Sequence, residues 1–475
     1  MTHAQNISLA TKALYGSGSI ASGIKDTAFN VFLLFFYTQV AGLSGALAGL
    51  AIFIALLLDA VSDPLVGYWS DRFKSAWGRR HPFMYFAALP MGAAFYFLFN
   101  PPFDASQNLL FVWMVVFAVL VRFFMTFYAV PSSALIAEMT ADYDERTTLS
   151  GYRVFLGWVG GLTFATIGYV VFFAPSDAFE DGRLNPAAYQ GFALLGASAI
   201  VVAILLCALG THHLIPRLKQ AAGQAAESKG LRRDLFNMWK NQPFMILVAI
   251  ILVSATAFGF TEVIGLYMYT YFWGLSATDL AGLTLVAFLG TLAAFILAPW
   301  LSKRFDKGPI ASAAILILMV TYPTFIGLRL LGVLPENGDP ALLIVLGASA
   351  VITVFAAVTM FILFVSMIAD TIDQNELATG QRQEAIYTSA YTFSLKATSG
   401  LGGLTAGLLL QGIQFPQNMT VEDIPQQTLN TLGLTVAGVI ISFWFIAFLI
   451  SRAYPLTRQA HEKIQSQLAA TVSAE

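Results

Sequence analysis

Residues 44–80 read SGALAGLAIFIALLLDAVSDPLVGYWSDRFKSAWGRR. The first 25 or so residues of this stretch are apolar enough, and long enough, to cross about 30 Å of hydrocarbon as one helix. Two aspartates, Asp59 and Asp63, lie inside the apolar run, and four basic residues follow at 72–80. A hydrophobic helix that ends in a basic turn is typical of a membrane span whose end faces the cytoplasm.

The composition of the whole chain agrees with a membrane protein. Of its 475 residues, 57% are hydrophobic and only 11% are charged, whereas about a quarter of the residues of a soluble domain are charged. The net charge of -2 gives no reason to expect a nucleic-acid partner. Cys207 is the single cysteine, which excludes an intramolecular disulfide.

Membrane-length hydrophobic stretches recur along the chain, and the backbone hydrogen bonding required in lipid makes them helices. The sequence predicts twelve such spans, at about 18–41, 44–68, 81–100, 108–138, 149–173, 188–210, 243–273, 278–301, 309–334, 341–370, 384–413 and 429–452.

The loops between these spans differ in charge from one side to the other. Loops such as 72–80 and 302–308 carry most of the basic residues, whereas Arg183 is nearly the only basic residue in the loops of the opposite side. The positive-inside rule therefore predicts a multi-pass protein of the plasma (inner) membrane with both termini in the cytoplasm.

Two halves of six spans repeat at an offset of 232 residues. Tyr37-Thr38 then matches Tyr269-Thr270, and Ile136-Ala137-Glu138 matches Ile368-Ala369-Asp370. Six helices bring the chain back to the side where it began, so the halves share one orientation. We therefore predict an all-α membrane protein with the major facilitator fold. Its domains would be two six-helix bundles at 1–210 and 241–455, a cytoplasmic linker at 211–240 and a cytoplasmic tail at 456–475.

The aspartates of the second span are the strongest candidates for chemistry. Asp59 and Asp63 are four residues apart and project from one helix face, and Asp26 lies at a similar depth in the first span. A carboxylate in the hydrocarbon costs about 2.5–3.5 kcal/mol. It persists where it faces a cavity, an ion or a partner. The sequence predicts a cation site for Na⁺ or H⁺, with a structural ion pair to Lys25, Arg153 or Lys396 as the alternative.

Three segments carry a family resemblance: residues 16–44 (GSGSIASGIKDTAFNVFLLFFYTQVAGLS), 57–82 (LLDAVSDPLVGYWSDRFKSAWGRRHP) and 130–153 (VPSSALIAEMTADYDERTTLSGYR). Together with 368–396 they resemble the glycoside–pentoside–hexuronide:cation symporter family, whose best-known type is the melibiose permease. Eukaryotic lysolipid symporters are similar in the same motifs. The resemblance implies transport of a small solute together with a cation.

The resemblance also implies roles for individual residues. The family's cation ligands map onto Asp59, Ser62, Asp63 and Thr126, where Ser62 replaces an asparagine. Positions that line the sugar pocket or its charge network match Lys25, Asp26, Arg153, Thr392 and Lys396. Where the family has a second sugar-binding aspartate and a nearby tryptophan, this chain has Ala129 and Ser133. Tyr128 could replace the lost stacking surface, or it could serve in packing alone.

Charged residues cluster at the predicted cytoplasmic ends of both halves. In the facilitator fold such charges hold the inner face closed, and the alternative is that they are solvated and only obey the positive-inside rule. The candidates for this cytoplasmic gate are Asp71, Arg72, Arg79, Arg80, Glu138, Asp142, Arg146, Arg304, Asp370, Asp373 and Glu376.

These observations predict a secondary active transporter, a symporter of a sugar, glycoside or related solute that works by alternating access. A lysolipid or other amphiphile symporter and an uncoupled facilitator are the alternatives. An enzyme is not expected, because the spans hold no arrangement of nucleophile and base or of metal ligands. We expect no cofactor, a coupling ion that is Na⁺ or H⁺, no metal site beyond the Na⁺ site, and function as a monomer in the bilayer.

Overall fold

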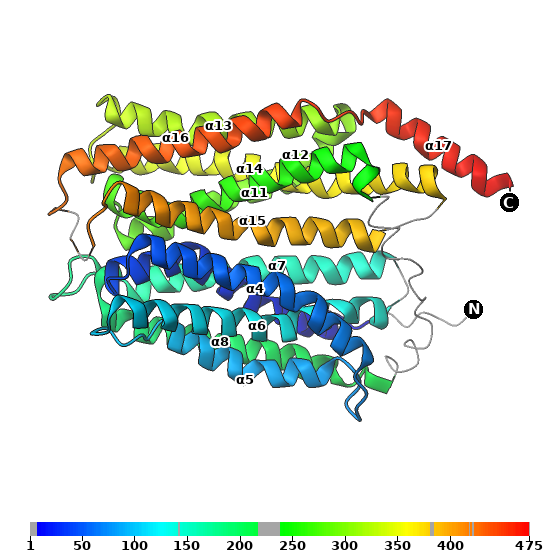
Figure 1. Cartoon of the computed structure of the whole chain (residues 1–475), viewed down its shortest axis with the longest axis horizontal. Helices are drawn as coiled ribbons and strands as arrows, with labels where there is room; N and C mark the ends of the chain where they lie inside the picture. The colour runs from blue at the N-terminus through cyan, green and yellow to red at the C-terminus, as the bar shows by residue number, and fades with distance from the viewer. Residues whose placement is uncertain are drawn as a thin grey trace.

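The computed structural model describes residues 7–140, 143–216, 238–380, 384–417, 419 and 422–474, and these fold into long, nearly parallel helices (Figure 1). The N-terminal half contains α1 (Leu9–Ser17), α2 (Ser19–Thr27), η1 (Ala28–Phe32), α3 (Leu33–Phe35), η2 (Phe36–Val40), α4 (Gly45–Arg72), α5 (His81–Leu98), α6 (Gln107–Met139), α7 (Tyr143–Ile167), η3 (Gly168–Phe172), η4 (Gly182–Leu184) and α8 (Pro186–His212).

The C-terminal half has the same kind of elements. It contains α11 (Gln242–Tyr267), η6 (Met268–Phe272), α12 (Ala277–Arg304), α13 (Lys307–Leu330), α14 (Pro340–Thr379), α15 (Glu384–Gly412), α16 (Gln426–Ser451) and α17 (Arg458–Ala474). Most of the predicted linker, residues 217–237, lies outside the described residues.

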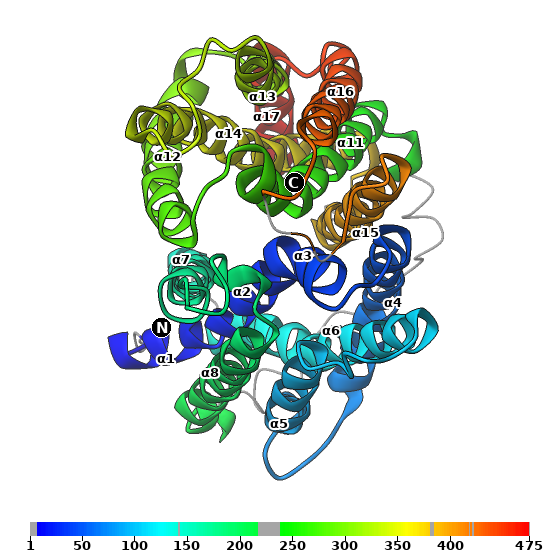
Figure 2. The ribbon, with the colours of Figure 1, turned by 90° about the vertical axis from the view of Figure 1, so that its left-hand side faces the viewer.

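The helices confirm the predicted all-α architecture of twelve membrane-crossing segments. Within the described residues, ten helical segments are long and apolar enough to cross a bilayer. The remaining two are α5 and α15, which run alongside the others in Figure 1. Figure 2, a view along the helices, separates the N-terminal bundle from the C-terminal bundle.

The helices begin where short polar residues cap them. The Ser276 hydroxyl accepts a hydrogen bond from the backbone N–H of Asp279, and the Asp279 carboxylate accepts one from the Ser276 backbone, which forms a capping box at the start of α12. Asn185 and Asp339 cap α8 and α14, each followed by a proline at the first helical position. These caps fix where the apolar segments enter the membrane.

The internal repeat predicted at 232 residues is present in the backbone. Adding 232 to the bounds of α4 gives the bounds of α12, and adding it to the bounds of η2 gives those of η6. Both η elements are turns of π-helix that end a first span.

The turn that follows these π-helical segments is also repeated. Gly42 has φ 76° and Gly274 has φ 61°, a left-handed conformation that favours glycine. Immediately after them, the backbone N–H of Leu43 and that of Leu275 each bond the carbonyl six residues earlier, at 2.8 and 2.9 Å. The two halves are therefore two copies of one structural plan.

Glycines bring helices of different halves into close contact along one seam. A Cβ added at Gly407 of α15 would lie 2.2 Å from the Gly45 carbonyl oxygen of α4, and one added at Gly403 would lie 3.0 Å from Ile52. In the N-terminal half, Gly161 packs in the same way on Gly23. Small residues at these crossings let the helix backbones approach closely.

The halves are tied together at the end of the molecule opposite α17, which we call the far end. Thr38 and Tyr267 are hydrogen-bonded through their hydroxyls, and the Tyr271 hydroxyl donates to Gln39 at 2.9 Å. In the loop before α8, Arg183 donates to the backbone carbonyl of Leu275 at 2.7 Å. Each of these bonds joins one half to the other.

Candidate functional site

The predicted cation ligands come together between α4 and α6. The Thr126 hydroxyl lies 3.0 Å from Asp59 Oδ1 and 2.8 Å from Asp63 Oδ1. The Ser62 hydroxyl is 3.4 Å from Thr126 Oγ1 and donates to the Asp59 backbone carbonyl at 3.1 Å. The four side chains that the family resemblance assigned to one site therefore lie close together. At a rise of 1.5 Å per residue, Asp59 lies about 20 Å along α4 from its first residue, Gly45.

The Thr126 hydroxyl cannot donate a hydrogen bond to both aspartates at once. The Thr126 hydroxyl carries a single hydrogen, so at any moment it donates to one of the two aspartates. Its lone pairs then face the other carboxylate oxygen at hydrogen-bonding distance. A cation coordinated by these oxygens, or a proton on one carboxylate, would turn this repulsive contact into an attractive one.

Arg122 is a member of the cluster that the sequence analysis did not consider. Its Nη1 lies 3.3 Å from Asp59 Oδ2, and both side chains are less than a tenth exposed. Its guanidinium also stands over the Phe29 ring at 4.7 Å. Arg122 offsets part of the charge of Asp59 and lowers the cost of burying that carboxylate.

A cavity of about 890 Å³ lies between the two halves. It reaches from Tyr169 and Trp273, near the far end, to Ile136 and Ser150, near the end where α17 lies. Its polar lining on the N-terminal half comes from Ser19, Ser22, Asp26, Thr27, Asn30 and Arg153. The opposite wall is mostly apolar and includes Leu283, Phe288, Val354, Phe361 and Trp444.

The predicted substrate residues divide between the cavity and its surroundings. Asp26 and Arg153 line the cavity. The Asp26 carboxylate is 57% exposed and lies 2.5 Å from Lys25 Nζ, whose side chain is only 12% exposed. Thr392 is exposed, and its hydroxyl donates to the carbonyl of Thr388.

Two predicted substrate residues give a different outcome. Tyr128 does not offer a stacking surface in this conformation, because its ring is 1% exposed and its hydroxyl packs against Gly18, between α6 and the first span. This placement fits the packing alternative. The side chain of Lys396 lies outside the described residues.

Among the described residues, several gate candidates form ion pairs within their own half. Glu138 accepts hydrogen bonds from Arg79 at 2.8 Å and from Arg80 at 3.0 Å. In the second half, Lys307 Nζ lies 2.6 Å from Asp370. Glu138 and Asp370 occupy equivalent positions of the repeat, so each half has an ion pair at this position.

The α17 helix adds a third partner in the second half. His461 Nε2 lies 3.0 Å from Asp373 and 3.5 Å from Asp370. The predicted span ended at residue 370, but α14 continues to Thr379, and this extension carries Asp373 to His461 of α17 and also holds Glu376.

Three further gate candidates, Arg72, Arg304 and Arg146, contact residues close to them in the sequence. Arg72 stands over the Tyr68 ring and Arg304 over the Trp300 ring, one helical turn away in each case. Arg146 donates to the Thr140 carbonyl at 2.9 Å. Asp142 and the side chain of Asp71 lie outside the described residues.

Sequence reasoning also missed a second carboxylate in the cavity. Glu262 is the single charged residue of α11 and lines the cavity. Like Arg122, it stands alone in an otherwise apolar stretch. The rule that intramembrane charges mark functional sites would have found both.

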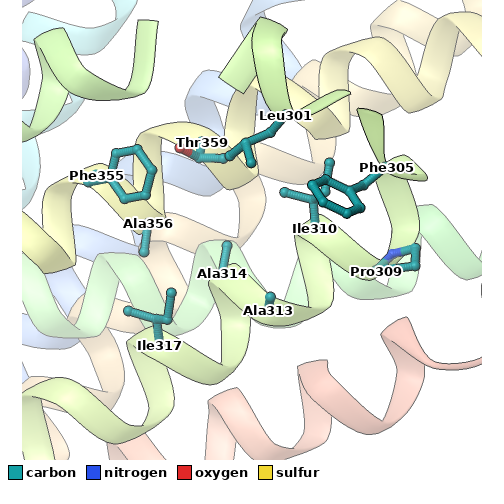
Figure 3. Close-up of a pocket in the computed structure, with 10 residues that line it drawn as sticks. All are labelled: Leu301, Phe305, Pro309, Ile310, Ala313, Ala314, Ile317, Phe355, Ala356 and Thr359. Carbon is teal, nitrogen blue, oxygen red and sulfur yellow. The ribbon is translucent and has the colours of Figure 1, made fainter. Parts of the chain in front are cut away.

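A second pocket, of about 330 Å³, lies between α12, α13 and α14 (Figure 3). Figure 3 shows Phe305, Ile310, Ile317 and Phe355 around it, and Thr359 is the single hydroxyl in its lining. A pocket lined almost wholly by hydrocarbon offers no recognition of a polar solute. The cavity between the halves is therefore the candidate solute site.

Sequence comparisons relate the whole chain to membrane transporters. Residues 14–458 match the sequence profile of the family described as MFS/sugar transport protein. An uncharacterized symporter of Synechocystis is 28% identical over 98% of both chains. The isoprimeverose transporter of Lactiplantibacillus pentosus is 25% identical and covers 92% of this chain and 86% of its own. The sphingosine-1-phosphate transporter MFSD2B of the mouse is 26% identical over 97% of this chain and 92% of its own.

Solved structures show the fold. The nucleoside transporter NupG matches with a TM-score of 0.63 at 16% identity, over 93% of this chain and 99% of that one. A bacterial homolog of the human lysosomal transporter Spinster matches with the same TM-score and identity, over 94% and 96% of the two chains.

Proposed function

The chain belongs to the MFS/sugar transport protein family, and from that premise we propose that it is a secondary active transporter that couples uptake of a glycoside or related solute to a monovalent cation. The observation that carries the coupling is the Thr126 hydroxyl between Asp59 and Asp63. Four oxygen-bearing side chains lie together there at membrane depth. Their oxygens can coordinate Na⁺, and one of the carboxylates can instead bind a proton.

The solute is proposed to bind in the cavity between the halves. Asp26 and Asn30 lie four residues apart, on one face of the first span, and both line the cavity. They offer acceptors and donors for hydroxyl groups. The apolar wall opposite would receive the less polar face of the solute or an attached aglycone.

Coupling follows from the cost of enclosing charge. Two carboxylates are expensive to remove from water, and a bound cation lowers that cost. The ion therefore favours the closed conformations that also carry solute, and its binding free energy shifts the population toward them. The bonds that join the halves at the far end fit a state that is closed on that side. With the predicted orientation, this is an inward-facing state.

The proposal is tested in proteoliposomes under separately imposed Na⁺ and H⁺ gradients, with a panel of neutral glycosides, uronides and lysolipids. We expect one gradient to drive accumulation and Asp59→Asn to abolish it while downhill solute exchange persists. Asp104→Asn, the same chemical change in an exposed loop, serves as the control. Gradient-driven accumulation that survives in Asp59→Asn would refute coupling at this site, and a wild type without any accumulation would make the protein a facilitator.

A second candidate function is symport of an amphiphile. The apolar wall supports it, as do Val154 and Trp158, which line the cavity and yet are 52% and 53% exposed. A relative that transports sphingosine-1-phosphate shares most of the chain length. If lysolipids, and not glycosides, are accumulated in the same panel, this candidate replaces the first.

A further inference from the structure

Glu262 is a carboxylate within the seventh span that the coupling mechanism does not use. It lies about 15 Å from the end of η6 at 1.5 Å per residue, deep in the apolar part of the seventh span. It is partly exposed, and the exposed part faces the cavity. A carboxylate at this depth costs about 2.5–3.5 kcal/mol, so its presence calls for a compensating interaction.

That interaction is not supplied by the described part of the chain. No lysine, arginine or histidine there forms an ion pair with Glu262, and no hydrogen bond to its carboxylate is found among those residues. Asp26, on the opposite wall, differs in this respect because it is paired with Lys25. Glu262 lines the cavity, where its oxygens can accept hydrogen bonds from a bound solute.

Aromatic side chains line the cavity on the same half as this carboxylate. Tyr269 lies in η6, seven residues after Glu262, and Trp273 follows the end of η6 and is almost fully buried. Tyr322 lines it from α13. The Tyr322 hydroxyl and the Trp273 indole N–H are buried and have no hydrogen-bond partner among the described residues.

The internal repeat gives Glu262 a counterpart. Subtracting 232 leads to Asn30, which also lines the cavity. Equivalent positions of two halves related by an axis through the cavity stand on opposite walls. A ring placed between them would meet an amide on one side and a carboxylate beside aromatic rings on the other.

We propose that Glu262 is a specificity-determining residue that accepts hydroxyl groups of a neutral sugar ring and excludes glycosides that carry a carboxylate; this rests on the proposed transport of glycosides. Both oxygens of a carboxylate can accept from adjacent hydroxyls of one ring, while Tyr269, which is only partly buried, gives its C–H face a platform. A uronate would bring a second negative charge beside Glu262 in a poorly solvated site. The carboxylate and the aromatic surface that this chain lacks at Ala129 and Ser133 would thus come from the other half.

Two commercial ligands that differ only at C6 test this directly. p-Nitrophenyl β-D-glucoside is neutral and p-nitrophenyl β-D-glucuronide is anionic at pH 7. Binding of each is measured by calorimetry on the full chain in lipid nanodiscs, free of glycoside detergents. We expect the wild type to prefer the glucoside by about tenfold or more, the scale of one charge-assisted hydrogen bond.

Glu262→Gln keeps the shape of the side chain and removes its charge. We expect it to weaken glucoside binding by about tenfold and to reduce the preference over the glucuronide to about threefold or less, with an unchanged melting temperature. Glu336→Gln makes the same change in an exposed loop and should change neither the affinity for the glucoside nor the preference over the glucuronide. A wild type that binds no glucoside, or binds both ligands equally, or a preference that survives in Glu262→Gln, would overturn the inference.

The outcome is separable from that of the proposed function. A preference lost in Glu262→Gln without gradient-driven uptake by the wild type would uphold the sugar site and refute symport. Gradient-driven uptake by the wild type, together with an unchanged ligand preference in Glu262→Gln, would uphold symport and refute the proposed role of Glu262.

Discussion

At the scale of single residues, the chemistry of the coupling site depends on one hydroxyl. Thr126 bridges two carboxylates that come from consecutive turns of α4. Its hydroxyl can donate to one aspartate while its oxygen helps to coordinate an ion that both aspartates face. The hydroxyl, and not the bulk of the side chain, is therefore what the site needs.

Thr126→Val tests this reading, because valine keeps the shape and removes the hydroxyl. We expect the apparent affinity for the coupling ion to fall about tenfold or more, since a hydrogen bond to a charged group is lost. The measurement is the initial rate of solute uptake against ion concentration, with Thr126→Ser as the control that retains the hydroxyl. An unchanged ion dependence in Thr126→Val would remove Thr126 from the ligand set.

Arg122 has a structural task in the same cluster. In Arg122→Met, Asp59 loses a buried partner, and the loss of one member of such a pair costs about 3–5 kcal/mol of stability. Asp59→Asn added to Arg122→Met should restore most of that stability, because the carboxylate that Arg122 faced is then neutral. Melting temperatures of the single and double variants in nanodiscs measure this. If the double variant is no more stable than Arg122→Met, the pair does not offset the charge of Asp59.

The sequence could predict part of this site. Two aspartates four residues apart in an apolar run are visible without coordinates, and the family resemblance pointed to Thr126. Arg122 was missed although it too is a charge in an apolar run, because its partner lies on another helix and is not apparent from spacing. Tyr128 was given a possible role in the cavity, but an aromatic side chain on a fully packed helix carries no sign of the face that it occupies.

At the scale of helices, the contact between α4 and α15 joins the two halves through backbone. The Gly407 Cα approaches the Gly45 carbonyl so closely that a Cβ would lie at 2.2 Å. Such a contact leaves no space for side chains at the crossing, and it tolerates little sliding of one helix on the other.

Gly407→Ala should therefore force the two helices apart. The expected cost is about 1–3 kcal/mol, the usual range for overpacking, and it should appear as a lower melting temperature. Gly412→Ala, five residues later on the same helix, meets nothing within 4 Å and should cause no loss. Equal melting temperatures for the two variants would show that α4 and α15 can move apart at this contact without loss of stability.

Helix ends were harder to predict than helix existence. Hydropathy gave the apolar part of α14 but not its extension to Thr379, because that part lies past the hydrophobic layer and is stabilised by contacts with α17. Residues 370–376 therefore belong to the interface with the tail helix as well as to the membrane span.

At the scale of the whole molecule, the duplicated plan could be read from the sequence, but the conformation could not. The match at 232 residues holds for helix bounds and for the turns at Gly42 and Gly274. Contacts such as Arg183 to Leu275 join segments that no local pattern connects, and we expect such contacts to decide which end of the cavity is closed.

Arg183→Ala should loosen the closed end. We expect a cysteine placed at Leu280, in the cavity near that end, to react faster with an impermeant maleimide added from the far side. The single native cysteine, Cys207, is buried and gives little background. Arg329→Ala removes an arginine that bonds within the C-terminal half and should leave the rate unchanged. The same rate in Arg183→Ala as in the parent would show that this bond does not hold the far end shut.

The repeat has a thermodynamic consequence. At the places equivalent to Asp59 and Asp63, the second half has Thr291 and Phe295, so the pair of carboxylates exists once in a molecule whose scaffold exists twice. On the proposed mechanism each cycle then carries one ion. The largest concentration ratio of a neutral solute that the protein can sustain would equal the electrochemical ratio of that single ion, and not its square.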